Sequence, residues 1–149
     1  MRRRKFIGGL TAALCAPSIS KAVQPGKIKI GQIGLAHPHA RGKLAAIRSL
    51  AEVYELVGVV EPNAARRKSV HGVKFISEDE LLNTKGLQAV AIETRVRDLV
   101  PTAARVVDTG RHIHLDKPAG PSLPAFQKLV ADAKRRKLTI QMGYMLRYN

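Results

Sequence analysis

Short apolar runs alternate with stretches of helical periodicity along most of the chain. Six runs rich in Val, Ile, Leu and Ala predict strands, at residues 27–33, 54–60, 73–76, 87–92, 112–115 and 138–142. Apolar residues at helical spacing predict helices, at residues 40–51, 63–70, 98–109 and 122–137. The segment Ser77-Glu78-Asp79-Glu80 is a capping box and predicts one more helical turn, which ends at Leu82.

This alternation of strand and helix predicts the fold class. Neighbouring parallel strands need a crossover connection, usually a helix, and such crossovers are right-handed. We therefore expect residues 27–149 to form a single α/β domain with a doubly wound, mostly parallel, Rossmann-like sheet. A length of 149 residues suits one domain, and an apolar content of 45% is enough for a core.

The first 22 residues have the pattern of an export signal. A basic start, Arg2 to Lys5, precedes a weakly apolar stretch at residues 6–16, and Ser20-Lys21-Ala22 resembles a cleavage site. The segment Arg3-Arg4-Lys5-Phe6-Ile7 is similar to a twin-arginine signal, with an ordinary Sec signal or an uncleaved anchor as the alternatives. The apolar stretch falls short of the roughly 20 residues that span a bilayer, so we expect a periplasmic protein without stable membrane insertion.

Charge and cysteine content change this picture little. The formal net charge is +15, and the first 26 residues hold five of the basic residues and no acid. The other basic clusters, at residues 66–68 and 134–137, lie where helices are expected and are not interleaved with aromatic residues, which argues against a nucleic-acid partner. The sole cysteine, Cys15, lies in the leader, so residues 27–149 need no disulfide in an oxidising compartment.

A glycine-led loop follows the first strand and opens the first helix. A dinucleotide-binding loop reads G-x-G-x-x-G there, and this chain has Gly34, Ala36 and His39 at the three glycine positions. The motif is degenerate, but the loop stands at the start of a helix, where a pyrophosphate can bind the helix N-terminus. We expect Gly34, Ala36, His37 and His39 to line the cofactor cleft. Two histidines at this spacing with no third ligand nearby do not predict a metal site.

The second strand ends in an acid, Glu61. A carboxylate at this position can accept hydrogen bonds from a ribose diol, which favours NAD. Arg66 and Arg67 are close enough in sequence to receive a 2′-phosphate, so NADP is an alternative cofactor. The alternative for Glu61 is a solvated residue at a strand end without a role in binding.

Asp116-Lys117-Pro118 ends the fifth predicted strand, at the edge where open α/β sheets collect ligands. An amine held there beside a carboxylate can bind or move a proton during chemistry at a carbonyl or carbinol. The alternative for Lys117 is a surface lysine that opens a loop.

Two segments are similar to motifs of the glucose–fructose oxidoreductase/inositol dehydrogenase/MocA (Gfo/Idh/MocA) family. Residues 110–118, GRHIHLDKP, resemble its G-K-H-V-x-x-E-K-P, and residues 143–149, GYMLRYN, resemble its G-[FY]-x-x-R-[FY]-x-P. Glu93-Thr94 stands where that family has an Ala-Thr-Pro turn. The resemblance covers residues 27–149 and implies the cofactor domain of a nicotinamide-dependent sugar or polyol oxidoreductase.

The resemblance also implies residue roles. Lys117 corresponds to the active-site lysine, Asp116 to the glutamate near the nicotinamide ribose, and Thr94 to a position beside the cofactor. Members of the family carry a second α/β domain that faces the substrate, and some are exported folded with cofactor bound. We expect that second domain to be absent here, as in a truncated form or an isolated cofactor domain. A non-catalytic nucleotide-binding module and a homo-oligomer are further expectations.

Overall fold

The computed structural model describes residues 26–144, which form a parallel sheet covered by helices on both faces. The strands are β1 (Ile28–Ile33), β2 (Tyr54–Val60), β3 (Ala89–Ile92), β4 (His112–Leu115) and β5 (Ile140–Met142). The helices are α1 (Ala40–Ser49), α2 (Ala64–Arg67), α3 (Glu78–Leu82), α4 (Val96–Asp108) and α5 (Leu123–Arg135). The expected leader, residues 1–22, lies outside the described residues.

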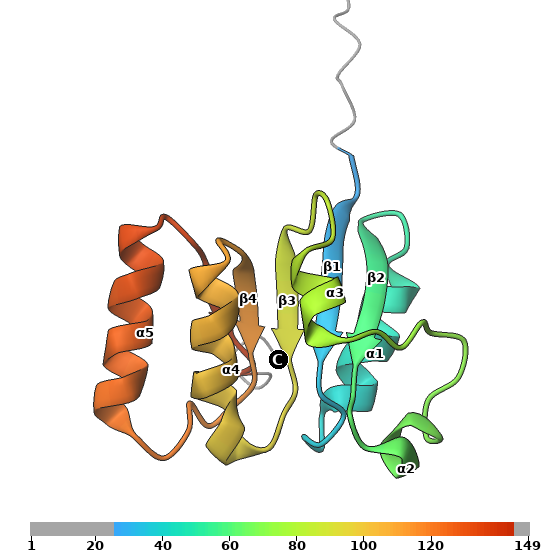
Figure 1. Cartoon of the computed structure of the whole chain (residues 1–149), viewed down its shortest axis with the longest axis horizontal. Coiled ribbons are helices and arrows are strands. Elements are labelled where there is room, and N and C mark those ends of the chain that lie inside the picture. Colours follow the sequence, from blue (N-terminus) through green and yellow to red (C-terminus); the bar gives the residue numbers. More distant parts are fainter. Residues whose placement is uncertain (1–25, 145–149) are drawn as a thin grey trace, which may run out of the picture.

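The strands pair in the order β2-β1-β3-β4-β5, and every pair is parallel. The arrows of β1, β2, β3 and β4 point toward the same, lower edge of the sheet (Figure 1). The order reverses direction between β1 and β3, which makes their carboxyl ends the switch point at which open α/β sheets bind ligands. The expected doubly wound, Rossmann-like fold is therefore confirmed.

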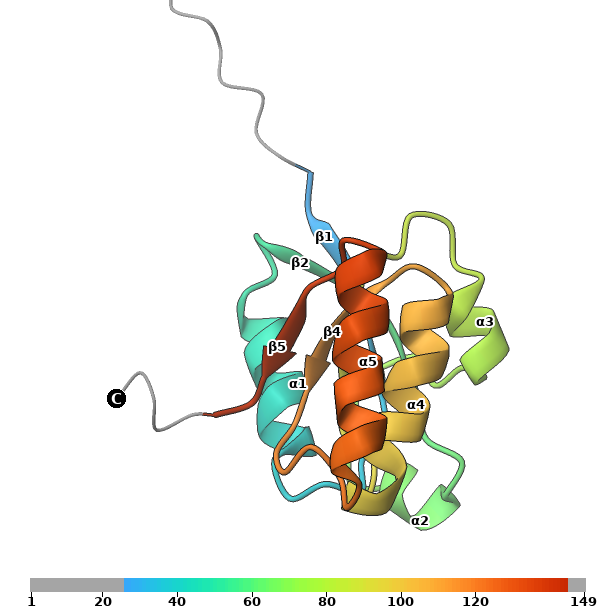
Figure 2. The same ribbon diagram turned by 90° about the vertical axis from the view of Figure 1, so that its left-hand side faces the viewer.

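The helices form two layers. Helices α3, α4 and α5 cover one face of the sheet and α1 covers the other, as the two perpendicular views show (Figures 1 and 2). The larger apolar cluster lies under α3, α4 and α5 and includes the fully buried Leu81, Leu99 and Leu115. Two smaller apolar clusters, which include Leu44 and Ile47, pack α1 against the sheet. No helix within residues 26–144 has the length and apolarity needed to cross a bilayer.

The strand expected at residues 73–76 is reduced to one bridge. Phe75 pairs with Val59 of β2, through bonds from the Val59 N–H to the Lys74 carbonyl and from the Ile76 N–H to the Val59 carbonyl. The chain turns at Gly72, where φ is +70°, and the cap of α3 follows at residue 77, so the extended stretch between them is short.

The helix ends follow the expected signals, with shifts of a few residues. Ser77 caps α3 and Ser122 caps α5, each through its hydroxyl oxygen. Gly110 lies just past α4 with φ of +78°, the left-handed conformation that suits glycine at a helix end. The basic helix expected at residues 63–70 is the single turn of α2, capped by Asn63.

Candidate functional site

A pocket of about 1000 Å³ opens at the carboxyl edge of the sheet, beside the switch point. Its walls are the β1–α1 loop, the end of β2 with α2, the α3 region and the start of α4. The residues expected to bind cofactor that line it are Gly34, Ala36, Glu61, Arg66 and Thr94. A pocket of this size and place suits a nucleotide-sized ligand.

Gly34 allows the β1–α1 loop to pass close to β3. Its φ is +95°, and a Cβ atom at this position would lie 2.7 Å from the backbone oxygen of Glu93. Both the backbone conformation and the close approach require glycine. The side-chain amide of Gln32 fixes the same loop, because it donates to the carbonyls of Gly34 and Ala40 at 3.0 and 3.1 Å.

The backbone amides of this loop are held from two sides. The Leu35 N–H donates to Glu61 Oε2 at 2.8 Å. The Ala36 and His37 N–H groups both donate to the backbone carbonyl of Glu93, at 3.2 and 3.0 Å. The loop is therefore tied to the ends of β2 and β3.

Glu61 joins the loop to the turn after β2. The residue is 4% exposed, and its Oε1 accepts from the Asn63 N–H at 2.8 Å and from Arg66 Nη1 at 3.2 Å. Its carboxylate also lines the pocket, so it stabilises the loop from a position that a ligand can reach. The expected site residues Glu61 and Arg66 thus form an ion pair at the pocket wall.

A second group of polar residues joins the β1–α1 loop to the ends of β3 and β4. We call His37, His39, Glu93, His114 and Asp116 the buried polar cluster. His37, Glu93 and Asp116 are buried, and His39 and His114 are half-buried. The His37 Nε2 N–H donates to the Lys117 carbonyl at 2.9 Å, and His39 Nδ1 lies 3.2 and 3.1 Å from the two oxygens of Asp116.

Asp116 stays ionised at the centre of this cluster. Burial raises the pKa of its carboxyl group, but the Lys117 N–H at 2.7 Å and the rings of His39 and His37 lower it, and the net pKa lies below the ordinary value. A Cβ atom on Gly143 would lie 2.9 Å from Asp116 Oδ1, so β5 passes close to this carboxylate only because residue 143 is glycine.

Burial favours the uncharged forms of the Glu93 and His114 side chains. Burial, followed by the nearby charge of Asp116, raises the pKa of Glu93 to about 8. Burial, followed by the charge of Lys43, lowers the pKa of His114 to about 4. Both Glu93 oxygens and His114 Nε2 are buried without a hydrogen-bond partner.

Lys117 is exposed, and its backbone is fixed on both sides. Its N–H donates to Asp116, its carbonyl accepts from His37, and the peptide bond to Pro118 is cis. Among the described residues its ammonium group forms no ion pair within 4 Å of a carboxylate. The side chain is thus free to meet a ligand that approaches this edge.

The structure therefore sorts the expected site residues into two places. Gly34, Ala36, Glu61, Arg66 and Thr94 line the pocket. His37, His39, Asp116 and Lys117 do not, and they meet at the ends of β3 and β4.

Three residues at this edge were missed by the sequence analysis as site residues. Glu93 follows the apolar run of β3 directly, and a charged residue at the end of a central strand was the available signal. His114 is half-buried on β4, between the buried Ile113 and Leu115. Arg95 immediately precedes α4, without a side-chain capping bond, and lines the pocket, and nothing in the sequence singled it out.

A glycine-led loop, an acid after β2 and a pocket at the switch point define a dinucleotide-binding α/β domain. Comparison with known families agrees with this class. The chain belongs to the GFO/IDH/MocA family, described as an oxidoreductase family with an NAD-binding Rossmann fold, whose profile matches residues 28–144.

A curated relative is the rhizopine catabolism protein MocA of Rhizobium meliloti, 29% identical over 126 residues. The match covers 83% of this chain and 38% of that protein. The chain therefore spans well under half the length of this relative.

Solved structures share the fold at low identity. The WlbA dehydrogenase from Chromobacterium violaceum, in complex with NADH and UDP-GlcNAcA, is 20% identical with a TM-score of 0.74, over 83% of this chain and 36% of that one. The scyllo-inositol dehydrogenase of Lactobacillus casei, with NAD(H) and scyllo-inositol bound, is 22% identical with a TM-score of 0.72, over 83% and 38%.

Proposed function

We propose that this chain binds NAD(H) in the pocket at the carboxyl edge and is the cofactor-binding domain of a sugar or polyol oxidoreductase. The observation that carries the proposal is the pocket itself, which joins the Gly34 loop to the Glu61 carboxylate across the switch point. Bound cofactor would supply a hydride acceptor or donor, while residues of this chain hold and orient it. The family membership and the NAD(H) complexes of the WlbA and inositol dehydrogenases support the same cofactor.

We propose NAD rather than NADP. The Glu61 carboxylate on the pocket wall can accept a hydrogen bond from a ribose hydroxyl, whereas it would repel a 2′-phosphate. Arg66 offers a cation nearby, but it is already paired with Glu61 at 3.2 Å. The full chain should bind NADH more tightly than NADPH, and Glu61→Gln should reduce the ratio of the two affinities. An unchanged ratio would contradict this role.

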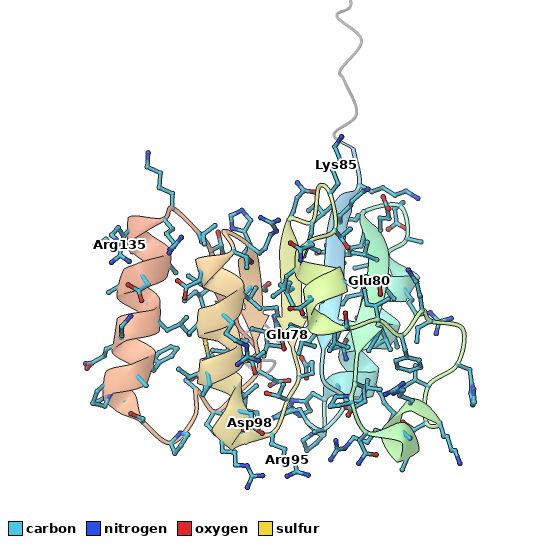
Figure 3. All side chains as sticks on the ribbon, viewed as in Figure 1. Glu78, Glu80, Lys85, Arg95, Asp98 and Arg135 are labelled. Atoms are coloured by element: carbon cyan, nitrogen blue, oxygen red, sulfur yellow. The ribbon has the colours of Figure 1, made fainter. Side chains whose placement is uncertain are left out.

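Arg95 is the residue we expect to meet the cofactor phosphates. Figure 3 shows Arg95 at the lower edge beside Asp98, at the start of α4, whereas Lys85 lies at the opposite edge of the sheet. The amino end of α4 adds its positive dipole to the arginine charge.

This assignment is tested by titrating the full chain with NADH and following the nicotinamide fluorescence. Arg95→Glu should weaken NADH binding about tenfold or more, because it places a carboxylate beside a pyrophosphate. Lys85→Glu makes the same change in net charge away from the pocket and should bind as the parent does. Equal losses in both variants would indicate a general effect of charge, and no NADH binding by the parent would refute the proposed function.

Lys117 is proposed as the group that polarises the substrate oxygen or relays its proton. Its backbone is held rigidly by Asp116 and His37 while its side chain is exposed, which suits an amine that must reach a second molecule. If this is so, Lys117→Ala should abolish NAD⁺ reduction with sugars or polyols and leave NADH affinity within about twofold. Equal loss of both would indicate a structural role.

A nucleotide-binding module without turnover is the second candidate function. It is favoured by the loop amides of Ala36 and His37, which already donate to the Glu93 carbonyl instead of pointing into an open anion site. NADH binding without NAD⁺ reduction across a panel of sugars, uronic acids and inositols would support it over the oxidoreductase.

We also propose export to the periplasm by the twin-arginine route, on the basis of residues 1–22. The leader fused to a folded reporter should be exported, and the double change Arg3→Lys and Arg4→Lys should block export. Undiminished export of the double variant would favour the Sec route.

A further inference from the structure

Three side chains of the buried polar cluster, those of His37, His39 and Asp116, place ligand-type atoms within 4.8 Å of one another. His37 Nδ1 lies 3.3 Å from Asp116 Oδ2 and 3.7 Å from Glu93 Oε2. His39 Nδ1 lies 3.1 Å from the same Asp116 oxygen. A tetrahedral metal ion with bonds of about 2.0–2.2 Å holds its ligand atoms about 3.3–3.6 Å apart. The three separations here lie within about 0.2 Å of that range.

The hydrogen bonds around His37 leave the correct nitrogen for a metal. Its Nε2 faces the Lys117 carbonyl at 2.9 Å and must carry a proton to make that bond. In the neutral ring the Nδ1 lone pair is then unprotonated, and it faces Asp116 and Glu93. An imidazole fixed by a bond from its outer nitrogen to a carbonyl is the usual arrangement at metal sites. The His39 N–H, 3.3 Å from Nδ1, is a long bond that a metal ion would replace.

Glu93 is a second observation, independent of these distances, that points to a bound cation. Its side chain is 0% exposed, and neither carboxylate oxygen has a hydrogen-bond partner within the described residues. One oxygen is turned toward His37 and the other toward His114 Nε2, at 3.9 Å. Burial of a carboxyl group without partners is unfavourable, because the group loses its hydration, and a bound cation would compensate for that loss.

We propose that His37, His39 and Asp116 bind one divalent transition-metal ion, with Zn²⁺ as the best match, and that Glu93, whose Oε2 lies 3.7 Å from His37 Nδ1, completes the ligand set. Two imidazole nitrogens and two carboxylate oxygens favour Zn²⁺ or Co²⁺ over Mg²⁺ and Ca²⁺, which prefer oxygen ligands alone. The two carboxylates balance the ionic charge. His114 Nε2 lies 3.9 Å from the other oxygen of Glu93.

The expectation of no metal site rested on His37 and His39 alone. The fold changes that by bringing Glu93 from the end of β3 and Asp116 from the end of β4 to the same loop. The ion would join the β1–α1 loop to both strands and thereby fix the floor next to the cofactor pocket. The site is separate from the residues proposed to hold the dinucleotide, so it stands whether or not NAD(H) binds.

The test is a metal titration of the full chain after treatment with a chelator. Calorimetry with Zn²⁺ should give one equivalent per chain, and Co²⁺ should give the intense visible absorption of a tetrahedral site. Zn²⁺ should also raise the melting temperature in a concentration-dependent way, because it binds the folded state.

Two variants and one control locate the site. His39→Ala and Glu93→Gln should each weaken Zn²⁺ binding about 10–100-fold and remove the tetrahedral Co²⁺ spectrum. His71→Ala removes an exposed histidine outside the cluster and should bind as the parent does. If Glu93→Gln fails to fold, His39→Ala carries the test, because the His39 side chain is 28% exposed.

Two results would overturn the proposal. One is the absence of stoichiometric Zn²⁺ binding, which would mean that the two carboxylates share a proton instead of a metal ion. The other is tight binding that survives both His39→Ala and Glu93→Gln, which would place the metal elsewhere on the chain.

Discussion

At the scale of single residues, two glycines show how backbone conformation and close packing decide what a position tolerates. Gly34 combines a φ of +95° with a neighbour 2.7 Å from where its Cβ would lie. Gly42, inside α1, has nothing within 4 Å of the same point.

Gly34→Ala should lower the free energy of unfolding by about 2–3 kcal/mol or more, because the methyl group must push the loop off the Glu93 backbone. It should weaken NADH binding as well. Gly42→Ala is the matched control and should raise stability by up to about 1 kcal/mol, since alanine favours helix over the unfolded chain. Urea unfolding of the two variants checks both signs. Similar stabilities would contradict the close approach at Gly34.

The site was predictable from the sequence only in part, for reasons visible at this scale. Gly34 and Glu61 stand at fixed places after strands, so their meeting at one pocket follows from topology. His37 was expected in the cleft, but its ring turns inward to Asp116 and the Lys117 carbonyl. These partners are about 80 positions away in the chain, and periodicity carries no information on such contacts.

At the scale of elements, α3 shows how a short helix is held. The Ser77 hydroxyl accepts from the Glu80 N–H at 3.0 Å, whereas the Glu80 carboxylate turns to Lys74 Nζ at 2.7 Å. The capping box expected from the sequence is thus formed on one side, and Leu81, fully buried beneath the helix, anchors it against β1.

Ser77→Ala should lower the free energy of unfolding by about 1 kcal/mol, because the amide of Glu80 loses its acceptor at the helix start. Ser49→Ala is the control, since that hydroxyl only donates to a carbonyl inside α1. Thermal or urea unfolding measures the difference. An equal loss in both variants would show that the Ser77 cap contributes nothing specific.

Element types were predictable because the strands are apolar runs bounded by turns, and the caps at Ser77 and Ser122 are local signals. The short strand at residues 73–76 was not, because an apolar run does not show how many of its residues meet β2, and only Phe75 pairs, with Val59. Pairing across a sheet is decided by such spatial limits, which a local pattern does not contain.

At the scale of the whole molecule, the buried polar cluster makes stability depend on pH. The folded state raises the pKa of Glu93 from 4.5 to about 8 and lowers that of His114 from 6.5 to about 4. Between pH 4.5 and 6.5 the two effects oppose each other. Above pH 6.5 only Glu93 still holds a proton in the folded state and not in the unfolded one, so stability falls as the pH rises.

In the presence of a chelator, the parent should lose about 2 kcal/mol of unfolding free energy between pH 6.5 and pH 8 from this group. Glu93→Gln removes the titrating carboxyl group and should show a smaller fall over the same range. Urea unfolding at both pH values gives the comparison. Parallel pH profiles for parent and variant would contradict the protonated state of buried Glu93.

The Glu93 carbonyl that accepts two loop N–H groups has a kinetic consequence for the molecule. The amides of Ala36 and His37 share one acceptor, and that of Leu35 is held by the neighbouring Glu61, so none can meet solvent without the loop lifting from β2 and β3 together. Their deuterium uptake should therefore follow a single opening event with one protection factor. A dinucleotide bound over this loop would slow the exchange of all three amides by the same factor.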